Sequence, residues 1–140
     1  MATDDELPRD IIARVLSGPP EECLDISIEL LQRLANSLNN VFGEEAFEAL
    51  LFRSARRVGN DYRWLHFDPR ARPADPEFEL FRTCFAGQDP ADIQAASILL
   101  FTTFVDILAL LVGAHLTKSI LKTALGRAHA AKISKEQQNG

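Results

Sequence analysis

Apolar residues recur every three or four positions along most of this chain, which is the spacing of an amphipathic helix. Proline, glycine and acidic residues interrupt the pattern and predict helices over about 8–16, 20–42, 44–58, 76–86, 90–112 and 114–131. No stretch alternates apolar and polar residues with the period of two that marks a strand. The pattern therefore predicts an all-α fold of five to six helices. The longest amphipathic stripe consists of Leu24, Ile28, Leu31, Leu34, Leu38 and Val41.

The sequence also resembles itself at an offset of 70 residues, which is half the chain. Residues 30–57 align with a segment that starts at residue 99 or 100, so that Gly43 falls on Gly113 and Leu34 on Phe104. The alignment predicts two pseudo-repeated helical hairpins, in half-repeats of about 8–72 and 76–133, packed around a central apolar helix. Chance similarity between two leucine-rich hairpins is the alternative explanation.

Two pieces of the chain carry a family resemblance. The segments VFGEEAFEALLFRSARRV, YRWL and LALLVGAHLTKSILKTAL are similar to the paired glycine-centred segments of small uncharacterised bacterial all-helical proteins from sensor-kinase neighbourhoods. The resemblance covers about half the chain and consists of aliphatic spacing around a glycine. It implies a helical-hairpin fold and a link to signal transduction, and it implies no known chemistry.

Composition fits one folded domain. The chain has 140 residues, of which 46% are hydrophobic and 25% charged, and its net charge is −5. A chain of this length buries a core without a metal or a disulfide, and Cys23 and Cys84 are expected to be reduced thiols. We expect a single helical domain over 8–133, with disordered ends at 1–7 and 134–140. The acidic start lacks a secretory signal, which predicts a cytoplasmic protein.

Residues 95–114 form an apolar segment with a single charge, Asp106, and are long enough to cross a bilayer. A carboxylate near the centre of such a segment offsets most of the gain from inserting its apolar side chains. A helix that is apolar on all sides is also typical of the core of a bundle. We therefore expect a core helix, with a membrane span as the alternative.

Four residues are candidates for a small-molecule or metal pocket: Asp106, His115, Glu45 and Trp64. A carboxylate in an apolar run must be paired, hydrogen-bonded or protonated, so Asp106 is expected in the core, bonded to Thr102, Thr103 or an arginine. His115 and Glu45 each lie two residues after a glycine turn. Because the His, Cys, Asp and Glu spacings supply fewer than three ligands, we expect no metal and no cofactor.

Charge alternates along the chain, and residues 51–72 form its most basic block. The arginines are interleaved with aromatic residues, a mixture found both in protein interfaces and in nucleic-acid sites. The negative net charge opposes nucleic-acid binding, and a solvated face paired with the acids of the first half is a third possibility. The candidate partner-binding residues are Arg53, Arg56, Arg57, Arg63, Arg70 and Arg72.

Known catalytic motifs, including GxSxG, the P-loop and HExxH, do not occur in the sequence. The sequence therefore favours a non-enzymatic regulatory or protein-interaction module, and a ligand-binding helical protein is the alternative. A homodimer is a further expectation, because the phenylalanines exceed what one small core can bury. That set consists of Phe78, Phe81, Phe85, Phe101 and Phe104.

Overall fold

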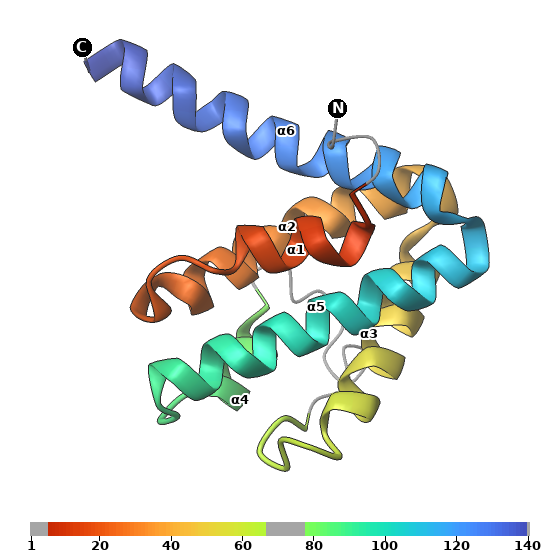
Figure 1. The fold of residues 1–140 in the computed structure, drawn as a ribbon, viewed down its shortest axis with the longest axis vertical. Coiled ribbons are helices and arrows are strands. Elements are labelled where there is room, and N and C mark those ends of the chain that lie inside the picture. The colour runs from red at the N-terminus through yellow and green to blue at the C-terminus, as the bar shows by residue number, and fades with distance from the viewer. Residues whose placement is uncertain (1–5, 67–77, 140) are drawn as a thin grey trace.

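The computed structural model describes residues 6–66 and 78–139, and the side chains of 6–66 and 78–126. Within these ranges the chain forms helices and no strands, which confirms the predicted all-α class. The elements are α1 (Pro8–Val15), a 3₁₀ turn η2 (Pro20–Glu22), α2 (Cys23–Phe42), α3 (Glu44–Val58), α4 (Glu79–Phe85), α5 (Pro90–Val112) and α6 (Ala114–Asn139) (Figure 1).

The two glycine turns of the sequence alignment have the same backbone geometry. Gly43 joins α2 to α3 with φ 91° and ψ 163°, and Gly113 joins α5 to α6 with φ 93° and ψ 155°. Each glycine amide donates a hydrogen bond to the carbonyl four residues earlier, at Asn39 and Ala109. This backbone region is open essentially to glycine alone. Both segments are thus helix–glycine–helix units, while the duplication itself stays a prediction.

The long helix of each unit packs against the second helix of the other unit. The long helix α2 packs against α6, and the long helix α5 packs against α3, while α2 and α5 also touch each other. The short helix α1 lies along α5 (Figure 1). The core between these helices is built from aliphatic side chains of α2 and α3 and aromatic rings of α4 and α5.

The phenylalanine set lies inside this core. Phe81, Phe85, Phe101 and Phe104 are fully buried, and Phe78 is half-buried and packs against the core. The expectation that these rings exceed the capacity of one core is therefore wrong. These five rings therefore do not provide the exposed aromatic surface on which the expected homodimer was based.

The apolar helix α5 serves as a core helix in this fold. By length and composition it is the one described helix that would qualify to cross a membrane, and half of its most apolar window is buried inside the protein. Its buried side chains face α1, α2, α3 and α6. Its outward stripe includes Ala95, Asp106 and Leu110, all exposed.

Helix α6 spans Ala114–Asn139, which extends past the helix end predicted near Ala131. The tail contains serine, lysine, glutamate and glutamine but no proline or glycine before Gly140, so propensity does not stop the helix. The predicted start of the fourth helix, at residue 76, lies outside the described residues.

One side chain fastens the connection between α1 and η2 to α5. The amide nitrogen of Gln94 donates hydrogen bonds to the carbonyl oxygens of Leu16 and Gly18, at 2.9 and 2.8 Å. These two carbonyls lie after the end of α1 and accept no hydrogen bond within a helix. The side-chain amide of Gln94 therefore donates the hydrogen bonds that these two carbonyls do not receive from the backbone of the short connection.

Candidate functional site

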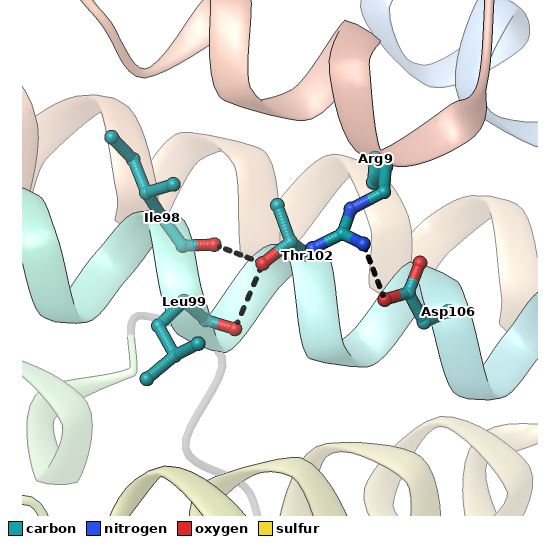
Figure 2. Close-up of polar contacts among 5 residues, drawn as sticks. All are labelled: Arg9, Ile98, Leu99, Thr102 and Asp106. Carbon is teal, nitrogen blue, oxygen red and sulfur yellow. Dashed lines mark hydrogen bonds and ion pairs between the residues drawn. The ribbon is translucent and has the colours of Figure 1, made fainter. Parts of the chain in front are cut away.

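Asp106 lies on the surface of α5. Its side chain is 48% exposed, and its carboxylate lies 3.8 Å from the guanidinium of Arg9 on α1 (Figure 2). The hydroxyl of Thr102 donates instead to the carbonyls of Ile98 and Leu99, one turn earlier in the same helix. The predicted arginine partner is present, but the predicted burial of Asp106 is wrong. On a helix that is apolar on almost every side, the Asp106 carboxylate takes the side that faces water.

Replacing Asp106 with asparagine is expected to change the free energy of unfolding by less than about 1 kcal/mol. A solvent-exposed ion pair gains little because water screens it and both side chains lose rotamer freedom. Denaturant titration of the variant beside wild type, at low and at high salt, measures the difference, and Arg9→Gln is the matched control. A loss near 3 kcal/mol or more is what a buried carboxylate would give, and it would contradict the exposed placement.

Trp64 belongs to an aromatic cluster that involves α4. Its ring lies edge-on to Phe85 at 5.1 Å and to Tyr62 at 5.7 Å between centroids. The indole is half-buried against the core. This placement gives Trp64 a packing role between the end of α3 and α4.

Glu45 and His115 are both exposed in the first turns of α3 and α6. The structure therefore distributes the four pocket candidates among different surroundings: two exposed helix starts, an ion pair with α1 and an aromatic cluster. Within the residues described, no three His, Cys, Asp or Glu side chains gather as metal ligands. The contacts of the described residues do not bring these four side chains together.

The two cysteines are separate thiols. Cys23 is buried next to Ser27, and the half-buried Cys84 donates a hydrogen bond to the carbonyl oxygen of His66 at 3.0 Å. Burial raises the pKa of the Cys84 thiol above its ordinary value of 9.0. The thiol is therefore protonated and weakly nucleophilic near neutral pH.

Alkylation of Cys84 by iodoacetamide is expected to be slower in the folded chain than in the chain unfolded by urea, at every pH between about 7 and 9. The raised pKa also means that the unfolded chain loses this proton at lower pH than the folded chain does. Stability should therefore fall as pH rises above about 9, because the unfolded state then binds fewer protons. Peptide-level mass spectrometry separates Cys84 from Cys23, and equal rates in both states would contradict the expected protection.

The arginine candidates are only partly brought together. Arg53, Arg56 and Arg57 lie together on the exposed side of α3, and Arg63 is exposed beyond its end. Arg70 and Arg72 lie outside the described residues. The guanidinium of Arg56 lies 5.8 Å from the centre of the Phe52 ring. Among the described residues no ion pair holds Arg53, Arg56 or Arg57 to the acids of the first half.

An open apolar groove runs beside these arginines, between α3 and the end of α5. One part has a volume of about 380 Å³ and is lined by apolar side chains and Arg53. The adjoining part, of about 610 Å³, lies among the three arginines, Asn60 and the end of α5. Leu111 lines both parts. The apolar lining consists of Phe42, Ala46, Ala49, Leu50, Ile107, Leu108, Leu110, Leu111 and Val112.

The walls of this groove include large apolar side chains left in solvent. Leu110 is 84% exposed and Leu111 is 65% exposed, and Phe42 at the end of α2 is also exposed. Scattered exposed leucines are ordinary, but a contiguous apolar patch beside a row of cations marks an interaction site. We call Arg53, Arg56, Arg57 and this groove the α3–α5 surface.

The sequence contained a signal for the groove that periodicity alone does not resolve. Helix α5 ends in LALLV, which is apolar on all sides, so some of these residues must face outward. Helix α2 ends in Val41 and Phe42, and both point away from the core. Which of these residues meet α3 depends on how α3 and α5 pack.

Comparison with protein-family models, with curated proteins and with solved structures finds no match to this chain.

Proposed function

We propose that this protein is a non-enzymatic protein-interaction module that binds its partner through the α3–α5 surface. The observation that carries the proposal is the open apolar groove flanked by three arginines that have no ion-pair partner among the described residues. A partner that fits combines apolar side chains with carboxylates, because arginine fork geometry suits carboxylates and the groove excludes water from apolar side chains. A regulatory role in a bacterial cytoplasm is part of this proposal.

The composition of the surface argues for a protein and against a nucleic acid. Glu44, Glu45 and Glu48 lie on the same helix as the three arginines, and their charges repel a phosphate backbone. The groove offers aliphatic walls, and the one aromatic ring in its lining is Phe42. Single-stranded nucleic acids are bound by stacking on several such rings along a basic channel.

Photo-crosslinking tests this function in cells of the source organism. A benzophenone amino acid in place of Leu110 reports on the groove, and the same group in place of Ala95, exposed near the start of α5, is the control. We expect a crosslinked protein from position 110, absent at position 95 and lost when Arg53, Arg56 and Arg57 are changed to glutamate. Equal crosslinking at both positions, or crosslinks only to nucleic acid or lipid, would overturn the proposal.

A further inference from the structure

Helix α3 carries charges that mirror one another about its centre. Its sequence over residues 44–57 is EEAFEALLFRSARR, and the midpoint lies between Leu50 and Leu51. Glutamates at 44, 45 and 48 stand at the same distances before this point as arginines at 57, 56 and 53 stand after it. Two copies of the helix laid antiparallel about a twofold axis at the midpoint would therefore place each glutamate level with an arginine of the second copy.

Of these charges, Glu45 and Arg56 lie at the centre of the side of α3 that the rest of the protein leaves open. Its buried side consists of Phe47, Leu50, Leu51, Ser54, Ala55 and Val58. Glu45, Ala49 and Arg56 are exposed and point outward together, by the 100° step of the helix. Among the described residues neither Glu45 nor Arg56 has an ion-pair partner. The small Ala49 near the centre of this face allows a second helix to approach closely.

The groove lies on one flank of this face. A twofold axis perpendicular to a pair of antiparallel helices keeps that flank on the same side in both copies. The exposed end of α5 meets α3 near Arg53, close to the centre of the helix, because Leu111 lines both parts of the groove there. The pair would therefore bring Leu110 and Leu111 of both copies together over the two grooves and remove them from water.

We propose that the partner of the α3–α5 surface is a second copy of this chain, docked antiparallel through α3 in an isologous dimer. The inference rests on the proposed function and names its partner. The second copy meets the chemical requirement derived above, since it presents carboxylates of Glu44, Glu45 and Glu48 beside the apolar end of α2. Glu45 faces Arg56 of the second copy, once on each side of the twofold axis, while Glu48 and Arg53 lie nearer the axis along the helix.

Sedimentation equilibrium of the full chain is the first measurement. The average molecular mass is expected to rise from 15.6 kDa towards twice that value between about 1 and 100 μM protein. Dimers with interfaces of modest area dissociate measurably in this concentration range. Added salt should weaken the association, because the flanking charges are exposed. A chain that stays monomeric over this whole range would overturn the inference.

Charge exchange tests the antiparallel geometry. An acidic variant carries R53E, R56E and R57E, and a basic variant carries E44R, E45R and E48R. Each is expected to be monomeric alone, because its contacts place like charges opposite each other, and an equimolar mixture is expected to form a heterodimer. A folded acidic variant and a folded basic variant that do not combine, or that each dimerise as wild type does, would overturn the geometry.

A variant in the apolar groove tests the contact even if the charge variants fail to fold, since reversed charges in α3 oppose the dipole of that helix. Leu110→Lys places a charge at the joined grooves and leaves α3 unchanged, and Ala95→Lys on the same helix is the matched control. We expect Leu110→Lys to raise the dimer dissociation constant at least about tenfold. An unchanged constant would contradict the proposed contact.

The outcomes separate this inference from the proposed function. A purified chain that is monomeric, yet crosslinks in cells from position 110 to a different protein, overturns the second copy and supports the interaction module. A dimer that Leu110→Lys and the charge variants disrupt, with crosslinks of twice the chain mass, supports both.

Discussion

Replacing Phe104 with alanine is expected to lower the free energy of unfolding by about 3–5 kcal/mol. The Phe104 side chain is fully buried, and its ring lies 5.8 Å from the ring of Phe47, between α5 and α3. Removing it leaves a cavity at the contact between the two helices that form the groove, and close-packed neighbours fill such a space only in part. Chemical denaturation monitored by circular dichroism measures the loss.

Phe42 provides the matched control for this substitution. It is the same residue type at the end of α2, where it is exposed, so Phe42→Ala should cost less than about 1 kcal/mol. Both variants are compared at low protein concentration, where association through the α3–α5 surface does not contribute. Similar losses at the two positions would contradict the placement of Phe104 in the core.

Alanine at Gly43 or Gly113 is expected to cost about 1–3 kcal/mol each, because both turns use a backbone region that a Cβ atom disfavours. The φ values are 91° and 93°, and no atom lies within 4 Å of a Cβ built at either position. The cost therefore comes from backbone strain and not from a clash. Thermal and denaturant unfolding of the two single variants gives the values, and similar losses are expected because the turns share one geometry.

Gly18 separates this strain from the general effect of removing a glycine. Its φ is not in the left-handed range, and open space surrounds its Cβ position. Gly18→Ala should leave stability unchanged or raise it by up to about 1 kcal/mol, through the reduced entropy of the unfolded chain. A loss at Gly18 as large as at Gly43 would remove the backbone explanation.

Helix positions could be predicted from the sequence because each amphipathic stripe ends at a strong breaker. Gly43 and Gly113 fixed two turns, and Pro90 fixed the start of α5. The end of α6 could not be placed, since no glycine or proline lies between Gly126 and Gly140. Helix ends that depend on propensity alone are the least certain part of such predictions.

The surroundings of Asp106 could not be derived from periodicity, because α5 is apolar on nearly every side and its stripe does not identify the core face. The position of the carboxylate was itself the better guide, since it marks the exposed side that also carries Leu110. Burial of the phenylalanine rings was underestimated for a related reason. Ring packing among α3, α4 and α5 depends on tertiary contacts that the sequence spacing does not contain.

The arginines of the α3–α5 surface could be predicted from the sequence, but its groove could not. Arg53, Arg56 and Arg57 are close in sequence and share a helix face, so their grouping follows from helical geometry. The groove beside them needs the crossing of α3 and α5, which local pattern does not supply. The mirror relation of the glutamates and arginines in α3 is readable in the printed sequence, but it gains meaning once the structure shows which side of α3 is open.

The two hydrogen bonds from Gln94 make the order of the first helix depend on a segment synthesised much later. Helix α1 has eight residues, too few to persist alone in water. Its apolar side rests on α5, and the connection that follows it is held by Gln94 of α5. During translation α1 emerges before α5, so it gains this packing surface only after residues 90–112 have left the ribosome. Until then α1 is accessible to chaperones and proteases. Protection of α1 from proteolysis therefore reports that α5 has packed against it.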